Sequence, residues 1–279
     1  MKIDAHQHFW KYDPVEYDWI DDSMSLLKKD FLPEHLTTEL SNCGFDGCIA
    51  VQARQTEEES RFLLDLAWQN KFIKGVVGWV DLRNKKVHER LEILSKNKLL
   101  KGIRHIVQSE PDDFMLKKDF QNGISVLKQF NLTYDILIYP RQLNSAIELV
   151  NHFPDQHFVI DHIAKPSIKE QKIESWKSGI MELALAPNVF CKISGLVTEA
   201  DRKYWEPEDF TSYLDVIFDV FSIDRLMVGS DWPVCLMAAG YKQVMVIIED
   251  YTRNFNKEDV AKVFGGNAIR FYDLKTDIE

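Results

Sequence analysis

Three short segments, far apart in the chain, carry side chains that could activate a water molecule. His6 and His8 lie near the N-terminus with one residue between them, His162 lies mid-chain, and Asp231 lies towards the end. Imidazole nitrogens bind a divalent metal or polarise a carbonyl oxygen, and a carboxylate accepts a proton from water. Brought together, these four side chains could hold a hydrolytic water and direct it at a carbonyl carbon.

Each segment on its own also has a purely structural explanation. A His-x-His pair is a weak signal, and His162 could simply donate to a loop carbonyl. Asp231 precedes Trp and Pro, and an aspartate in that setting often starts a turn. The chemical interpretation therefore depends on whether the fold brings the three segments to one place.

Eight short apolar or β-branched segments recur along the chain and predict strands. They cover residues 2–8, 47–53, 73–80, 100–108, 134–139, 157–163, 188–194 and 224–231. Helical spacing of apolar residues predicts helices over 57–71, 85–97, 141–153, 213–221, 240–255 and 257–264. Strands that alternate with helices predict a parallel sheet. Eight such units in 279 residues favour a single closed (β/α)₈ barrel, with an open doubly wound sheet as the alternative.

A closed parallel barrel gathers the carboxyl ends of its strands at one mouth. The two N-terminal histidines end the first predicted strand, His162 ends the sixth and Asp231 the eighth, so we expect all four to converge there. Strand alternation also predicts Asp4 on the same face as the histidine pair. Residues 9–34 form a long connection rich in aromatics, which we expect to lie over this mouth. We expect one domain over residues 1–279, because no linker divides the chain.

Composition narrows the classes of partner. The net charge of -10 argues against nucleic acid, because phosphate binding requires a basic face. No apolar run approaches the ~18 residues of a membrane span. We expect no signal peptide, because the first residues lack the basic start and the apolar core of one. The four cysteines form no CxxC pair, which indicates reduced thiols and a cytoplasmic protein. We therefore expect a small-molecule partner, and no pattern indicates a particular oligomeric state.

Several segments resemble the sugar-lactonase branch of the amidohydrolase superfamily, which includes L-fuconolactonases and L-rhamnonolactonases. They are IDAHQHFW, VQARQTEEE, GIRHIVQ, VIDHIAKP, CKISGLVTEAD, DRLMVGSDWPVC and FGGNAIRFY, and they extend from residue 3 to about 272. The HxH and GSDWP elements mark the superfamily, whereas VQARQT and DHIAKP are more specific to this branch. The resemblance implies a (β/α)₈ barrel that hydrolyses aldonolactones.

The resemblance also implies roles for the four candidate residues. His6, His8 and His162 would surround the lactone carbonyl or one divalent metal ion, zinc, and Asp231 would activate water. Many superfamily members carry a further metal ligand after strand 5, but here that strand ends in Ile-Tyr-Pro and no histidine follows His162. A binuclear centre is therefore not expected. Only these four residues could hold a metal, and the resemblance implies that activity need not depend on one.

Six further residues are expected to contact the substrate, and all lie at or just beyond strand ends: Arg104, Lys165, Tyr139, Gln52, His105 and Trp232. The first three are implied by the resemblance, and the others by their positions. Arg104 and His105 are adjacent, so alternation allows only one of them to face the lumen unless the strand has already ended. We expect Arg104 to face inward, with His105 as a second candidate.

Three functions remain open on the sequence. Hydrolysis of a neutral, hydroxyl-rich sugar lactone fits best, because few cations are available at the predicted mouth: Arg104, Lys165, Arg54 and Lys192. The alternative is a metal-dependent decarboxylase or aromatic-lactone hydrolase of the same superfamily, which should require more arginines. A third function, from a different class, is non-catalytic binding of a sugar acid.

Overall fold

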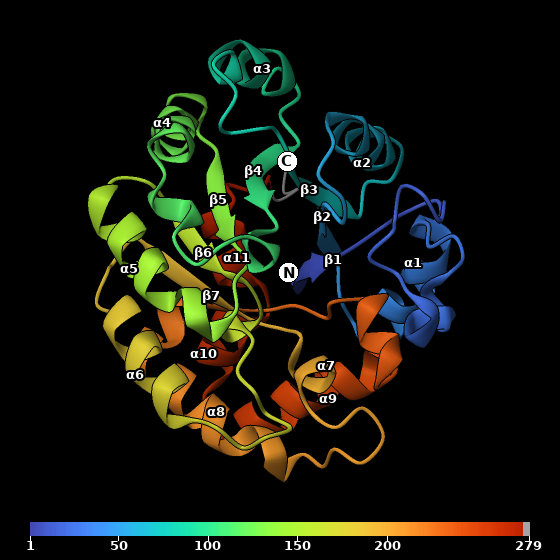
Figure 1. Ribbon diagram of the computed structural model, residues 1–279. Helices are drawn as coiled ribbons and strands as arrows, with labels where there is room; N and C mark the ends of the chain where they lie inside the picture. The colour runs from blue at the N-terminus through green and yellow to red at the C-terminus, as the bar shows by residue number, and fades with distance from the viewer. Residues whose placement is uncertain (276–279) are drawn as a thin grey trace.

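Eight parallel strands form the centre of the structure, a computed structural model that describes residues 1–275 (Figure 1). The strands pair in chain order. Their bounds are β1 (Ile3–Gln7), β2 (Gly47–Val51), β3 (Ile73–Gly78), β4 (Leu100–His105), β5 (Thr133–Ile136), β6 (Phe158–Ile160), β7 (Val189–Ile193) and β8 (Leu226–Val228). A parallel bridge between Gln7 and Trp232 joins the last strand to the first. The predicted (β/α)₈ barrel is confirmed.

Most of the helices surround the barrel, whereas α11 lies behind the strands (Figure 1). They are α1 (Pro33–Asn42), α2 (Glu57–Gln69), α3 (Val87–Leu94), α4 (Lys118–Leu127), α5 (Leu143–His152), α6 (Glu174–Leu183), α7 (Leu196–Glu199), α8 (Glu208–Phe221), α9 (Tyr241–Thr252), α10 (Lys257–Ala261) and α11 (Asn267–Phe271). All six predicted helices are present, whereas α1, α4, α6, α7 and α11 were not predicted. In α4 a central glycine weakens the helical signal. Gly123 is needed there, because a Cβ would lie 2.1 Å from the Leu82 carbonyl oxygen. Among residues 1–275, no helix combines the length and the apolar character needed to cross a membrane.

The apolar core is divided by the sheet. The larger part lies between the strands and the surrounding helices. The smaller part joins residues of strands on opposite sides of the barrel, such as Val51 and Val159, to α11, and so lies inside the barrel. In Figure 1, α11 lies behind the strands, where it closes the N-terminal end. Gly265, just before α11, lets the backbone pass close to the start of β1, because a Cβ there would lie 2.2 Å from the Met1 carbonyl oxygen.

An irregularity in β1 changes which of its residues face the lumen. The register of β1 against β2 shifts between Asp4 and Gln7, and such a bulge interrupts strict alternation. The prediction that Asp4 shares a face with the histidine pair is therefore wrong. The Asp4 carboxylate instead accepts hydrogen bonds from Ser230 Oγ (2.6 Å) and from Tyr241 Oη on α9 (3.1 Å).

The connection between β1 and α1 is ordered and aromatic. Trp10 and Phe31 pair through backbone hydrogen bonds of 2.9 Å, and a 3₁₀ helix covers Asp22–Leu27. The Trp10 ring packs against Tyr17, Trp19 and Phe31. Because of this packing, the connection forms a fixed wall beside the barrel mouth.

Candidate active site

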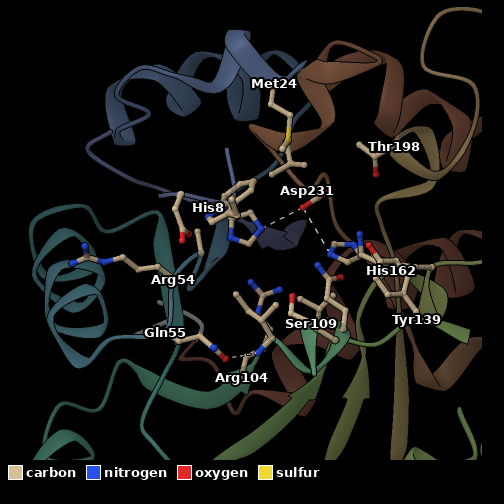
Figure 2. A pocket seen from close by; sticks show the side chains of 18 of the residues that line it. His8, Met24, Arg54, Gln55, Arg104, Ser109, Tyr139, His162, Thr198 and Asp231 are labelled. Atoms are coloured by element: carbon tan, nitrogen blue, oxygen red, sulfur yellow. Dashed lines mark hydrogen bonds and ion pairs between the residues drawn. The ribbon is translucent and has the colours of Figure 1, made fainter. Parts of the chain in front are cut away.

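The structure brings the four candidate catalytic side chains together at the carboxyl end of the barrel, and Figure 2 shows three of them, His8, His162 and Asp231. His6 Nε2 lies 3.2 Å from His8 Nε2. Asp231 Oδ1 lies 3.3 Å from His8 Nε2 and 3.9 Å from both His6 Nε2 and His162 Nε2. All four residues are buried. In Figure 2, His8 and His162 flank Asp231 on opposite sides.

Unusual backbone conformations direct two of these side chains inward. Asp231 has φ 58°, and the four residues from His162 to Lys165 all have φ between 47° and 61°. This left-handed turn after β6 is closed by a 2.7 Å hydrogen bond from Lys165 N to the His162 carbonyl. Left-handed geometry costs an L-residue roughly 1–2 kcal/mol. Conformations of this cost are concentrated at functional sites.

Two glycines make room for the histidine rings. A Cβ on Gly195 would lie 2.7 Å from His162 Nδ1, and one on Gly229 would lie 2.6 Å from His6 Cβ. Both glycines directly follow residues of the strand ends that form the mouth. Larger residues at these positions would displace the imidazoles from Asp231.

Each histidine ring is anchored through its other nitrogen. His8 Nδ1 lies 2.8 Å from the Val51 carbonyl oxygen, which can only accept, so His8 Nδ1 carries a proton. His162 Nδ1 contacts Ser194 Oγ at 2.9 Å, and His6 Nδ1 lies 3.2 Å from Asp161 Oδ1. With the Nδ1 proton of His8 engaged in this way, its Nε2 faces the centre of the site.

Burial and charge determine the protonation of the site. Burial lowers the pKa of His162 to about 3, with the cations of Lys165 and Arg104 adding to the effect. Burial likewise holds the pKa of His6 well below its ordinary value. Although burial alone would raise it, the neighbouring imidazoles, His162 foremost, hold the pKa of Asp231 below its usual range. At neutral pH the site therefore presents the ionised carboxylate of Asp231 beside the neutral imidazoles of His6 and His162.

This group of residues can hold a metal ion. His6 Nε2, His8 Nε2 and Asp231 Oδ1 lie within 4.8 Å of one another, and neutral imidazole with carboxylate is a donor set that zinc prefers. Three hydrogen-bond acceptor atoms this close repel one another unless a proton or a cation lies between them. The spacing of these ligand atoms therefore suits a single metal ion. A second group, His6, Asp161 and His162, fits less well, because two basic side chains already engage Asp161.

A layer of buried charge lies beneath the histidines, and sequence reasoning largely missed it. Asp161 Oδ2 accepts from Arg104 at 2.9 Å, and Asp161 Oδ1 lies 3.0 Å from Lys192 Nζ. Lys192 also pairs with Asp135 Oδ2 at 2.5 Å. The sequence suggested Lys192 as a cation of the mouth, but it is fully buried below it. A single lysine within an apolar strand was the signal that could have identified this layer.

Above the histidines lies a cavity of about 910 Å³. Three of the expected substrate contacts line it: Arg104, Lys165 and Tyr139. The Lys165 ammonium pairs with Glu199 at 2.8 Å and lies 5.9 Å from the Tyr139 ring centre. Several lining residues were not singled out from the sequence: Met24, Gln55, Gln108, Ser109, Thr198 and Arg202. They come from loops and very short helices beyond the strand ends, which are too short for a periodicity to indicate which side chains point inward.

The other three expected contacts lie outside the cavity lining. His105 faces away from the lumen, because it alternates with Arg104 on β4. Its ring stacks on Phe114 and its Nε2 lies 3.0 Å from Glu110. Gln52 is fully buried and donates to the Arg104 carbonyl at 3.1 Å. Trp232 packs against aromatic rings of the β1–α1 connection.

A parallel eight-stranded barrel, with histidines at the ends of β1 and β6 and an aspartate after β8, is the architecture of a (β/α)₈-barrel enzyme with its active site at the carboxyl ends of the strands. The sequence profile of the amidohydrolase family matches residues 3–274, and the chain belongs to this family. The predicted superfamily is confirmed.

Comparison with known proteins identifies relatives that match nearly the whole chain. The chain is 38% identical to an L-fucono-1,5-lactonase of Burkholderia multivorans, over 98% of this chain and 96% of that protein. It is 35% identical to an L-fucono-1,5-lactonase of Burkholderia ambifaria, with the same two coverages. A crystal structure of a zinc-bound amidohydrolase from Burkholderia multivorans superimposes with a TM-score of 0.96. It covers 99% of this chain and 100% of that one, at 37% identity.

Proposed function

We propose that the protein hydrolyses a sugar lactone, an aldonolactone such as L-fuconolactone or L-rhamnonolactone. The observation that carries the proposal is the single ionised carboxylate, Asp231, held among three imidazoles at the floor of the cavity. The similarity to L-fucono-1,5-lactonases over almost the whole chain supports the choice of substrate.

In the proposed reaction Asp231 accepts a proton from a water molecule as the water oxygen attacks the lactone carbonyl carbon. The ring C–O bond then breaks, and the departing ring oxygen takes the proton from Asp231, which leaves an open-chain hydroxy acid. The Arg104 guanidinium, which lines the cavity, would donate to the carbonyl oxygen as negative charge develops on it. A zinc ion held by His6, His8 and Asp231 would supply Lewis-acid polarisation of the same oxygen.

The charges of the cavity favour a neutral substrate. Four basic and four acidic side chains line it, excluding the histidines. Arg104 pairs with Asp161, Lys165 pairs with Glu199, and Arg54 pairs with Glu16. Three of the four cations are therefore already neutralised, and the fourth, Arg202, is exposed. A carboxylated aromatic substrate would require cations that are free to pair with it, so the decarboxylase and aromatic-lactone alternatives are disfavoured.

A substrate panel tests the proposal. Purified protein is incubated with aldonolactones of both ring sizes, with an aromatic lactone and with aromatic carboxylic acids, with and without a chelator. Acid release is followed by pH-stat, and loss of the aromatic substrates by absorbance. We expect acid release from at least one deoxyhexonolactone well above the spontaneous rate. Turnover of the aromatic compounds alone, or binding of lactone without turnover, would overturn it.

A further inference from the structure

Lys192 is a charged side chain in a place where charge is costly. It is fully buried inside the barrel, on β7, and none of its atoms lines the cavity. A buried ammonium is tolerated only when it is well paired. Its Nζ lies 2.5 Å from Asp135 Oδ2, 3.0 Å from Asp161 Oδ1 and 3.3 Å from His6 Nδ1. Lys192 is therefore a bridge between two carboxylates and the first histidine.

The two carboxylates have different surroundings. Asp135 faces away from the site and also accepts a 2.8 Å hydrogen bond from the hydroxyl of Tyr272, which directly follows α11. Asp161 faces the site: its Oδ2 is held by Arg104, and its Oδ1 is reached by Lys192 and by His6 Nδ1. A connected series of buried polar groups thus runs from the closed end of the barrel to His6.

The orientation of His6 depends on which of its nitrogens carries the proton. Arg104 NH1, which can only donate, lies 3.3 Å from His6 Nε2. His6 Nδ1 lies 3.2 Å from the Asp161 carboxylate, which can only accept while ionised. Both contacts favour a proton on Nδ1 and a lone pair on Nε2, directed at His8 and Asp231. In the opposite tautomer, Lys192 would donate to a bare Nδ1, and the Nε2 proton would point at the Arg104 guanidinium.

We propose that Lys192 is a positioning residue, which holds Asp161 Oδ1 against His6 Nδ1 and thereby keeps the His6 Nε2 lone pair facing Asp231. The inference rests on the proposed function only for its kinetic consequence. Without Lys192, Arg104 alone would hold Asp161, through the other oxygen. The carboxylate could then rotate about that contact, and His6 would lose its defined partner. Loss of a partner behind a site histidine typically costs about 10- to 100-fold in activity or metal affinity.

The test separates positioning from simple charge balance. Lys192→Met keeps the length of the side chain but leaves Asp135 and Asp161 with only Arg104 as a cation. The double variant Lys192→Met/Asp135→Asn removes one charge of each sign, so its stability should return towards that of wild type, as measured by urea unfolding. Tyr272→Phe is the matched control, because it removes a donor from Asp135 and leaves Lys192 in place.

Two readouts follow for each variant. Steady-state kinetics should show kcat lower by about 10- to 100-fold in both Lys192 variants, with KM changed less than about threefold, and near wild-type kcat in Tyr272→Phe. ¹⁵N-histidine NMR of chelator-treated protein, with His6 assigned from a His6→Asn sample, should show the proton on Nδ1 in wild type and a mixture in the Lys192 variants.

The outcomes are distinct. If the double variant recovers both stability and kcat, Lys192 only balances the charge of Asp135 and the proposal is overturned. A His6 proton found on Nε2 in wild type also overturns it. If no lactone is turned over, the lactonase function fails, yet the NMR comparison still decides whether Lys192 orients His6.

Discussion

At the residue scale, two buried aspartates, Asp231 and Asp4, have different pKa values because their surroundings differ. Asp231 is ionised because imidazoles surround it. Burial instead raises the pKa of Asp4 to about 6, and hydrogen bonds from Ser230 and Tyr241 offset this only in part. Both aspartates lie near the junction of β1 and β8. Their surroundings, rather than their residue type, determine that Asp231 is the one suited to accept a proton from water.

Replacing Asp231 with asparagine should remove the proton acceptor and keep the shape of the site. We expect Asp231→Asn to lower kcat by about 100- to 10,000-fold, the usual contribution of a general base. Far-ultraviolet circular dichroism should be unchanged. The matched control is Asp219→Asn on the exposed side of α8. Lactone hydrolysis at wild-type rates in Asp231→Asn would remove this residue from the mechanism.

At the scale of the element, the ends of strands determine where side chains point. The turn after β6 places His162 and Lys165 on the cavity wall through four successive left-handed residues. Ala164, within this turn, is fully buried and has φ 61°. The conformation of the turn is therefore maintained by the packing around it, and at position 164 that packing surrounds a small side chain.

Substitutions of Ala164 should discriminate between backbone strain and lost packing. Ala164→Gly relieves left-handed strain of roughly 1–2 kcal/mol but loses a buried methyl and adds chain entropy, so the net change should be within about 1 kcal/mol. Ala164→Val places a β-branched side chain in the same conformation and should destabilise by at least about 2 kcal/mol. Urea unfolding measures both. Equal destabilisation by the two variants would show that left-handed strain at position 164 does not contribute measurably to the free energy of unfolding.

The β1–α1 connection is attached to the barrel through a buried carboxylate on α2. Glu59 accepts hydrogen bonds from the Ala53 and Arg54 backbone amides, the latter at 2.9 Å, and from the Tyr17 hydroxyl at 3.3 Å. Burial raises the pKa of Glu59 to about 7, from an ordinary value of 4.5. The folded protein thus retains this proton at pH values where the unfolded chain has lost it.

The pH dependence of stability should reflect Glu59. Because its pKa is raised in the folded state, its contribution to stability is fully present below about pH 4.5 and is lost as the pH rises through about 7. Glu59→Gln carries no titrating proton, so its Tm relative to wild type should rise across this window. Glu58→Gln, at the exposed neighbouring position, is the control and should show no such pH dependence of Tm. A Tm difference independent of pH would contradict the assignment.

At the scale of the whole molecule, closure of the barrel creates the site. The Asp231 amide donates to the His6 carbonyl at 2.8 Å, and the His8 amide donates to the Trp232 carbonyl at 2.7 Å. These bonds join segments more than 220 residues apart in the chain. The candidate metal ligands are therefore assembled only in the folded protein.

Zinc should consequently stabilise the folded state. Metal that binds only the folded protein raises stability by about 2.7 kcal/mol at 100 times its Kd. We expect a Tm that rises with zinc concentration and falls again after addition of a chelator. His8→Gln should abolish the shift, whereas His88→Gln on the exposed face of α3 should preserve it. A shift of the same size in His8→Gln would mean that zinc binds elsewhere.

The sequence by itself determined the barrel and the convergence of His6, His8, His162 and Asp231. Both follow from local patterns, because alternating strands and helices make a parallel barrel, and such a barrel gathers the ends of its strands. Only the tertiary structure decided that Asp4 faces α9, because a one-residue bulge is invisible to a period of two. It alone placed Lys192 between two carboxylates, since contacts between residues 57 positions apart follow from barrel closure and not from local pattern.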